Sequence, residues 1–447
     1  MKEVPMRWSR RGFLRLCAVA GIGGVGAGFT GCAGKFLDDS LLHAPAQGEA
    51  RPPKRPDRFI LRRDLGDIKG AYAPGPESTR MLSLAQLSDV HITLEGFSLT
   101  GHPKLEKMLD GFGDSIGFGG LDRPEIIERF DVDVLRALIK TLNAADTDID
   151  LVVNTGDSVD IGTIRELISF LTEMNQLNIP WFQTVGNHDR LVLGNIPSRL
   201  VEAYSGMDFL DKNAFIEKHF PTGKDIAGTT YGSRAKGFDF SPRSEVNPSV
   251  RVGFYTFTAL PPVHGGLRGG RARPGIRFYV LDTSRSEGSA SGQISDEQLE
   301  WLARQLKSHS DYLGIVVSHH PIAHIKENQS RLLDLLLASP KVIALLCGHD
   351  HEHRITPYQA PGGLGFWQIQ TSSLIDFPQQ GRMLEIYMNP EGTGVVRTFV
   401  FNQQAAGHLG ENARASYAEA SKDRFDGSGK EQDRNADLIF SIAGRLR

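Results

Sequence analysis

The chain has 447 residues, a formal net charge of −3 and a hydrophobic content of 40%, which is sufficient for a large globular core. The slightly acidic balance does not favour nucleic acid as a partner, because such binding depends on neutralising many phosphates. With only Cys17, Cys32 and Cys347 available, a disulfide framework is excluded.

The first 32 residues predict an export signal. Residues 9–15 read Ser-Arg-Arg-Gly-Phe-Leu-Arg and resemble the twin-arginine motif S-R-R-x-F-L-K. The apolar stretch that follows is glycine-rich and too short for a transmembrane helix. We therefore expect export by the twin-arginine machinery to the periplasm or the outer face of the cytoplasmic membrane. The alternative is a basic tail beside an uncleaved anchor.

Residues 29–32 read Phe-Thr-Gly-Cys and resemble a lipobox. In that interpretation Cys32 carries a lipid anchor and becomes the mature N-terminus. Phe29 stands where leucine is usual, so lipidation of Cys32 and simple removal of the signal both remain open. Residues 33–80 are rich in proline and charge and are expected to form a linker.

Beyond the linker, five apolar runs predict strands, and each run ends at a polar motif. Polar residues at strand ends suit a rigid scaffold that presents functional loops. The runs and their motifs are residues 81–88 with Asp89-Val90-His91, 150–155 with Gly156-Asp157, 181–185 with Gly186-Asn187-His188-Asp189, 312–318 with His319-His320-Pro321, and 342–347 with Gly348-His349-Asp350-His351.

Helical patterns separate these strands. Apolar residues recur at spacings of three and four over residues 132–142 and 164–171, and Ser295 is the predicted N-cap of a further helix. Closing strands are expected over residues 367–371, 383–388 and 394–401. The alternation of strand and helix predicts an α/β core. Periodicity alone does not distinguish a two-sheet sandwich from a doubly wound sheet.

Long insertions separate the motifs, namely residues 92–128 and 191–251. The first contains a Gly/Phe segment at residues 111–120, which is either a mobile lid facing the substrate or an ordered surface loop. Residues 403–447 are polar apart from an apolar run near 438–443 and are expected to form a C-terminal tail.

The motifs D-x-H, GD, GNH(D/E), H-x-P and GH-x-H, in this order, resemble the calcineurin-like metallophosphoesterase superfamily. The resemblance spans residues 81–402. Together with the export signal and long insertions, it is similar to a little-characterised bacterial group of this superfamily. It implies an αββα fold, a two-sheet β-sandwich flanked by helices, with metal ions at the strand ends along one edge.

The resemblance also implies a ligand set for two divalent or mixed-valence metal ions. It assigns Asp89, His91 and His351 to one ion and Asn187, His319 and His349 to the other, with Asp157 as the bridge. Carboxylate, amide and imidazole donors suit Mn, Fe or Zn. In an extended backbone, His349 and His351 would point to opposite faces, so a turn must bring them together. Purple acid phosphatases have an iron-bound Tyr three residues after the bridge, whereas this chain has Asp160.

In the family, the histidine of GNH is a general acid or a stabiliser of the transition state, which implies these roles for His188. Asp189 would orient the His188 imidazole. The nucleophile would be a metal-bound hydroxide, since coordination lowers the pKa of water to about 7.

The sequence thus predicts an exported phosphomonoesterase or phosphodiesterase that acts on small phosphate esters. Which of the two activities it has remains open. The alternative is a catalytically silent metal-binding protein of the cell envelope that uses its insertions to bind a partner. The presence of His188 favours the enzyme, because a binding protein has no need for an acid that protonates a leaving group.

Overall fold

A computed structural model provides the structure of the protein. It describes residues 51–66, 68, 73–93, 130–145, 148–192, 194, 196–197, 209–210, 215–216, 235–239, 244–247, 249, 251–259, 275–285, 289–308, 312–361, 364–390, 392–403, 408–423, 426–442 and 445. The expected signal peptide, Cys32 and the Gly/Phe segment lie outside these residues. None of the helices in the described ranges is both long and apolar enough to cross a membrane.

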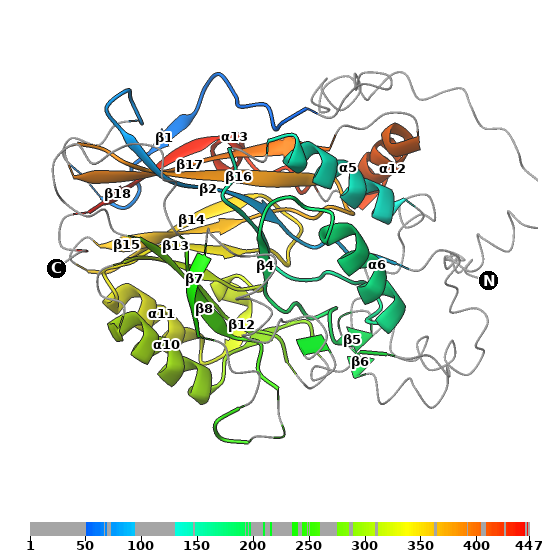
Figure 1. Cartoon of the computed structure of the whole chain (residues 1–447), viewed down its shortest axis with the longest axis horizontal. Coiled ribbons are helices and arrows are strands. Elements are labelled where there is room, and N and C mark those ends of the chain that lie inside the picture. The colour runs from blue at the N-terminus through cyan, green and yellow to red at the C-terminus, as the bar shows by residue number, and fades with distance from the viewer. Residues whose placement is uncertain are drawn as a thin grey trace, which may run out of the picture.

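Two seven-stranded sheets lie face to face (Figure 1). In the first sheet, β16 pairs antiparallel with β2, whereas β2, β3 and β4 run parallel to one another. Its strands, in spatial order, are β1 (Ile60–Arg62), β18 (Ala436–Ser441), β17 (Thr393–Asn402), β16 (Gln380–Met388), β2 (Thr79–Leu87), β3 (Leu151–Asn154) and β4 (Trp181–Gln183).

The second sheet has a parallel centre, in which β9, β11, β13 and β15 run in the same direction. Its strands, in spatial order, are β14 (Arg354–Gln359), β15 (Gly365–Gln370), β13 (Val342–Cys347), β11 (Leu313–Val317), β9 (Ile276–Val280), β8 (Tyr255–Ala259) and β7 (Ala235–Asp239). Two small ribbons accompany the sheets, formed by β5 (Leu191–Val192) with β6 (Ile196–Pro197) and by β10 (Gly292–Gln293) with β12 (Ile325–Glu327).

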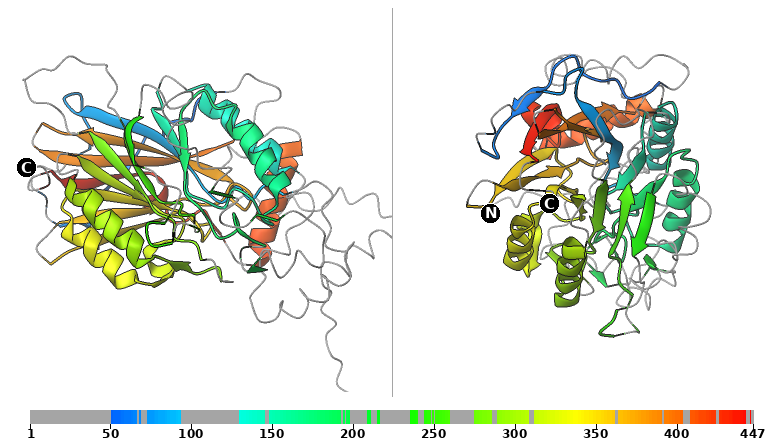
Figure 2. Two further views of the ribbon diagram at one scale, coloured as in Figure 1. Left: turned by 60° about the horizontal axis from the view of Figure 1, so that its bottom comes forward. Right: turned by 60° about the vertical axis from the view of Figure 1, so that its left-hand side comes forward.

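Helices flank the two-sheet body (Figures 1 and 2). On the side of the first sheet lie α5 (Asp131–Asn143) and α6 (Ile164–Met174). On the side of the second sheet lie α10 (Asp296–Ser308), α11 (Gln329–Ala338) and the short 3₁₀ turn η4 (Ile322–His324). The Ser295 hydroxyl accepts a hydrogen bond from the backbone N–H of Gln298, which confirms the predicted cap.

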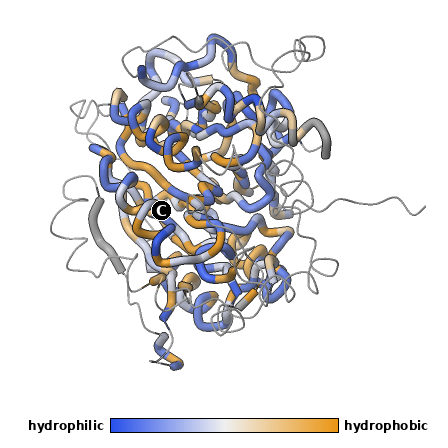
Figure 3. The backbone as a smooth tube through the Cα atoms, turned by 90° about the vertical axis from the view of Figure 1, so that its right-hand side faces the viewer, coloured by the Kyte–Doolittle hydropathy of each residue, from blue (hydrophilic) through white to orange (hydrophobic). Residues whose placement is uncertain are grey.

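The main hydrophobic core lies between the sheets and includes side chains such as Leu84 and Val153 from the first and Phe278 and Ile315 from the second. A separate cluster packs α10 and α11 against the outer face of the second sheet. In Figure 3, hydrophobic stretches run mainly through the interior of the body. The predicted α/β fold, two sheets flanked by helices, is confirmed.

The ends of the described chain differ from the sequence-based expectation. Residues 60–62, within the expected linker, form β1, and residues 436–441, within the expected polar tail, form β18. β1 pairs with β18, and β18 pairs with β17, so both segments extend the first sheet. The tail also contains α12 (His408–Asp423) and α13 (Glu431–Arg434). The buried side chains of Leu438, Ile439 and Phe440 explain why this segment folds onto the sheet.

Candidate metal centre

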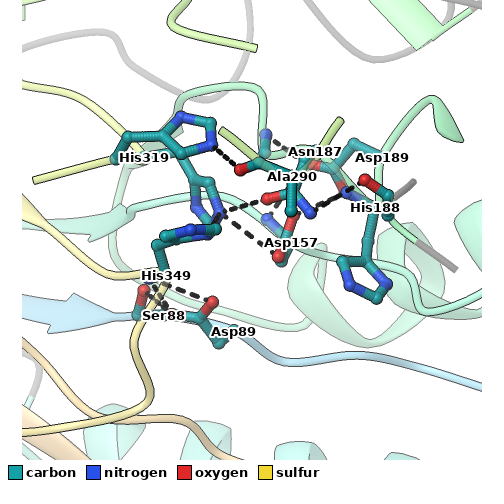
Figure 4. A network of polar contacts seen from close by, with 12 residues as sticks. Ser88, Asp89, Asp157, Asn187, His188, Asp189, Ala290, His319 and His349 are labelled. Carbon is teal, nitrogen blue, oxygen red and sulfur yellow. Dashed lines mark hydrogen bonds and ion pairs between the residues drawn. The ribbon is translucent and has the colours of Figure 1, made fainter. Parts of the chain in front are cut away.

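The parallel strands of both sheets end at one edge of the sandwich and deliver the five motifs there. Asp89 follows β2, Asp157 follows β3 and Asn187 follows β4, whereas His319 follows β11 and His349 follows β13. The two sheets are joined at this edge by the Gln86 amide, which donates to the backbone oxygen of Cys347 at 2.9 Å. All seven predicted ligands therefore fall in one continuous cluster, part of which is seen in Figure 4.

A first group within the cluster consists of Asp89, His91 and His351. The Nε2 atoms of His91 and His351 are 3.1 Å apart. Nε2 of His351 is 3.4 Å from Asp89 Oδ1. Asp89 is held in place by the backbone N–H of His349, which donates to its carboxylate at 3.0 Å.

A second group consists of Asn187, His319 and His349. Nε2 of His319 lies 2.9 Å from Asn187 Oδ1 and 3.3 Å from Nδ1 of His349. The orientation of the Asn187 amide is fixed, because its Nδ2 donates to the backbone oxygen of Gly194 at 3.2 Å. Its oxygen therefore faces the group.

Asp157 lies between the two groups. Its Oδ2 atom is 3.7 Å from Nε2 of His91 and 3.2 Å from Nε2 of His319. The other carboxylate oxygen, Oδ1, accepts a hydrogen bond from the backbone N–H of His188 at 2.9 Å. One oxygen of this buried side chain thus faces both groups, which is the placement that a bridging ligand requires.

The backbone at these positions is unusual. Seven non-glycine residues in the described part of the chain have a positive φ, and five of them belong to the predicted ligand set. Such conformations cost about 1–2 kcal/mol each and persist where surrounding contacts enforce them. They provide the expected turn at His349 and His351. The five residues are Asp89, His91, Asp157, His349 and His351.

The donor set fits cations. In the second group, Nδ1 of His319 donates to the backbone oxygen of Thr155 at 2.9 Å, so the ring in its neutral form presents a lone pair at Nε2. That lone pair faces the Asn187 oxygen and the Asp157 carboxylate, which are also acceptors. Acceptors that converge in a buried site repel one another unless a positive charge lies among them. Ligand atoms about 2.0–2.2 Å from an ion have mutual distances of about 3 Å or more, as here.

In the first group, too, acceptor atoms converge in a buried site. Nδ1 of His91 donates to Asp160 Oδ1 at 2.8 Å, and Nδ1 of His351 donates to Asp376 Oδ2 at 2.6 Å. In their neutral forms the two rings would direct lone pairs at each other across 3.1 Å, so a proton or a metal cation is needed between them. This pattern, in which a carboxylate holds the outer nitrogen of an imidazole, is common among metal-binding histidines.

The local electrostatics favour positive charge. Burial alone would lower the pKa of His319, but the carboxylates of Asp157 and Asp89 raise it to about 9. Burial is likewise outweighed at His351, where Asp89 and Asp376 raise the pKa to about 10. Burial opposes ionisation of Asp157, yet the neighbouring imidazoles of His319 and His188 hold its pKa well below its usual range. A cation at this place would therefore displace protons.

His188 lies beside the first group, with its ring 4.5 Å from that of His91 between centroids. Its Nδ1 donates to the backbone oxygen of Asp160 at 2.7 Å, which leaves Nε2 for another partner. The side chain is 19% exposed and is thus accessible to a small molecule at the cluster.

Asp189 has a different position from the one expected. Its carboxylate accepts backbone hydrogen bonds from Gly186 at 2.7 Å, Ser158 at 2.7 Å, Asp157 at 3.1 Å and Val159 at 3.3 Å. Asp189 therefore ties the loop after β4 to the loop after β3. The group that orients the His188 ring is Asp160, because a carboxylate committed to four amides is not directed at the imidazole.

Other polar residues near the motifs support the cluster from outside. His320 contacts Thr283 Oγ1 at 2.8 Å and the backbone oxygen of Ala290 at 2.9 Å, and His353 lies 3.1 Å from Gln380 Oε1. Asp160 and Asp376 were not among the predicted site residues. Asp160 could have been suspected from its position three residues after Asp157, whereas Asp376 belongs to no motif.

Comparisons with known proteins identify a family of phosphoesterases. The model of the family described as calcineurin-like phosphoesterase matches residues 82–353. A probable glycerophosphodiester phosphodiesterase GpdQ from Arcobacter nitrofigilis is 25% identical over 236 residues, 49% of this chain and 64% of that protein. Tartrate-resistant acid phosphatase type 5 from Sus scrofa is 24% identical over 206 residues, 42% of this chain and 46% of that protein.

Among solved structures, a dimetal phosphatase from Danio rerio matches 73% of this chain and 100% of its own, with 15% identity and a TM-score of 0.43. The alignments to the two curated relatives each cover less than two thirds of the relative. The family match covers more than half of the 447 residues and contains all five motifs. The chain therefore belongs to the calcineurin-like phosphoesterase family.

Proposed function

We propose that the protein is an exported hydrolase of small phosphate esters that works with two metal ions. The observation that carries the proposal is the pair of acceptor groups that share Asp157, with the non-ligand imidazole of His188 beside them. The names of the curated relatives, a glycerophosphodiester phosphodiesterase and an acid phosphatase, support phosphate esters as the substrate class.

In this proposal Asp89, His91 and His351 would hold one ion, Asn187, His319 and His349 would hold the other, and Asp157 would contribute to both. When bound, such ions make hydroxide available from water near neutral pH and offset negative charge on the phosphoryl oxygens. Manganese, iron and zinc all suit a mixed set of carboxylate, amide and imidazole donors.

The protein residues contribute positioning and a proton. The ester bond between phosphorus and the leaving oxygen breaks as hydroxide attacks phosphorus, and the leaving oxygen needs a proton. His188 can donate that proton from Nε2, because its Nδ1 is held by the backbone oxygen of Asp160. The backbone N–H of His188 also donates to Asp157. The proton donor is thereby tied to the carboxylate that lies between the two ligand groups.

We also propose that this reaction takes place outside the cytoplasm. The twin-arginine sequence at residues 9–15 supports that location. Because this route transports folded proteins, the protein can bind its metal ions in the cytoplasm before export. Which metals it carries then depends on their availability there and need not follow the site's order of affinity for divalent metals.

The test is a paired assay of the mature protein loaded with manganese, iron or zinc. One substrate is a chromogenic phosphomonoester and the other is its matching diester, and His188→Ala is measured alongside. The proposal expects hydrolysis by the wild type and a loss of about 10²–10⁴-fold in the variant. The ratio of the two rates identifies the preferred ester class.

Two metal ions per chain with no hydrolysis of any phosphate ester beyond the His188→Ala background would overturn the proposal. That result would instead support the alternative of a catalytically silent metal-binding protein.

A further inference from the structure

The loop that follows β15 reaches the metal centre from a part of the chain beyond the family match, which ends at residue 353. Asp376 lies in this loop, and its carboxylate accepts the hydrogen bond from Nδ1 of His351 at 2.6 Å. With Nδ1 engaged, Nε2 of His351 faces Asp89 Oδ1 at 3.4 Å. Asp376 thus selects the tautomer and the ring orientation that a ligand to an ion needs.

The same loop also holds the other side of the first group. The hydroxyl of Ser373 donates to the backbone oxygen of Asp89 at 2.8 Å and accepts from the backbone N–H of Asp376 at 3.2 Å. The backbone N–H of Leu374 donates to the same oxygen of Asp89 at 3.2 Å. One short loop therefore fixes two members of the first group relative to each other.

The C-terminal helix α12 holds this loop in turn. The Gln379 side-chain amide donates to Asn412 Oδ1 of α12 at 2.6 Å and to the backbone oxygen of Ile375 at 3.0 Å. Asn412 is fully buried, and the ring of Tyr417 packs edge-on against Phe377 with centroids 5.2 Å apart. These contacts lie on both sides of Asp376 along the loop.

The segment after α12 approaches the His351 turn directly. The backbone oxygen of Gly427 accepts a hydrogen bond from the N–H of His353 at 2.8 Å. A Cβ atom at Gly427 would lie 2.2 Å from the backbone oxygen of His351 and 2.6 Å from that of Phe377, so no larger residue fits here. The C-terminal region thus packs against the backbone of the turn that carries His351.

We propose that Asp376 is a positioning residue for His351, and that α12 holds it in place for that role. This inference rests on the proposed metal-dependent function, because it assigns His351 to an ion. It gives a part in that function to Asp376, Asn412 and Gly427, which lie outside the five motifs. Asp376 acts through His351 rather than on the substrate.

The experiment measures metal affinity, which does not depend on turnover. Metal-free wild type, Asp376→Ala and Asp376→Glu are titrated with zinc against a chromophoric chelator. Loss of the carboxylate is expected to weaken one of the two bound equivalents by about 10–100-fold and to leave the other within a few-fold. The Glu variant, which retains a carboxylate, is expected to recover part of the affinity.

A matched control separates positioning from general destabilisation. Asp437 is a buried carboxylate of β18 that pairs with Arg397 at 2.6 Å and contacts no residue of the centre. Asp437→Ala is expected to lower thermal stability and to keep wild-type zinc affinity. Asn412→Ala, in α12, is expected to weaken the same equivalent as Asp376→Ala but to a smaller extent.

Wild-type affinity in Asp376→Ala would overturn the inference, as would equal weakening of both equivalents or the same weakening in Asp437→Ala. Failure of the proposed function is a separate result. In that case the wild type binds two zinc ions and hydrolyses no ester, while the difference between the Asp376 variants and the control still holds.

Discussion

The Asp160 carboxylate accepts the hydrogen bond from Nδ1 of His91 at 2.8 Å. The backbone oxygen of the same aspartate holds the ring of His188. One residue thus holds a predicted ligand through its side chain and the predicted proton donor mainly through its main chain, while Oδ1 of the same carboxylate lies 3.4 Å from Nδ1 of His188. Substitution of the side chain should separate the two roles.

For Asp160→Ala we expect metal affinity to fall by about 10–100-fold, because His91 loses the group that orients it. At saturating metal, the rate should recover substantially, since the hydrogen bond that Nδ1 of His188 donates at 2.7 Å goes to the backbone oxygen, whereas the carboxylate oxygen lies farther away, at 3.4 Å. Chelator competition and the metal dependence of kcat measure the two effects. Asp133→Ala, which removes an ion pair with Arg136 on α5, is the control. A rate that stays low at saturating metal would contradict this separation.

Gly194 makes room for the predicted proton donor. A Cβ atom there would lie 2.4 Å from Nε2 of His188 and 2.4 Å from Nδ2 of Asn187. We expect Gly194→Ala to lower kcat at least tenfold, because it displaces both side chains. Gly392→Ala is the matched control, since Gly392 also has a positive φ but has no atom within 4 Å of the added carbon. Equal loss of activity in both variants would show that backbone strain alone is responsible.

Asp157 offers a test of the shared position between the two groups. An amide in place of the carboxylate removes the negative charge that faces both His91 and His319. We expect Asp157→Asn to lose bound metal from both positions and activity with it. Metal content by elemental analysis after gel filtration measures this directly. Loss of activity with two ions retained would contradict the bridging assignment.

Asp131 predicts a pH dependence of stability. Its carboxylate is buried at the start of α5 and accepts hydrogen bonds from Thr93, and burial raises its pKa to about 7. In the unfolded chain an aspartate has a pKa of about 3.9. Between about pH 4 and pH 7 the folded state therefore holds a proton that the unfolded state has lost. The free energy of unfolding should fall as pH rises through this window, by about 1.4 kcal/mol per pH unit.

Asp131→Asn should remove this contribution. Denaturant unfolding of both proteins between pH 4.5 and pH 8 gives the difference in free energy at each pH. Parallel curves for the two proteins would show that Asp131 does not titrate in this range.

The sequence indicated that the predicted ligands would gather at one edge, because they follow apolar strands in a fixed order. The runs that end at Asp89 and Asp157 became β2 and β3, and the helical patterns became α5 and α6. Strand ends of parallel strands meet at one edge, so local patterns were sufficient to place these ligands together.

The hydrogen bonds that hold the predicted ligands in place could not be predicted from local sequence patterns. Asp376 meets His351 across 25 residues, and its loop carries no periodic or motif signal. Asp189 was expected to orient the His188 ring, whereas its carboxylate accepts hydrogen bonds from four backbone amides, which no local pattern indicates. The strand β18 was not predicted, because it lies in a mostly polar region and its six residues are too few to show the alternation of apolar and polar side chains that marks a strand.

Because β18 pairs with β17, the C-terminal segment cannot be removed without exposing an edge of the first sheet. A chain cut to residues 81–402 would contain all five motifs but would leave the side of β17 that faces β18 unpaired along residues 393–398, while the other side stays paired with β16. It would also uncover Trp367, whose Nε1 donates to the backbone oxygen of Ile439 at 3.0 Å. An exposed sheet edge beside apolar side chains recruits strands from other molecules. Such a fragment is expected to aggregate, even though it spans the whole stretch over which the sequence resembles the family.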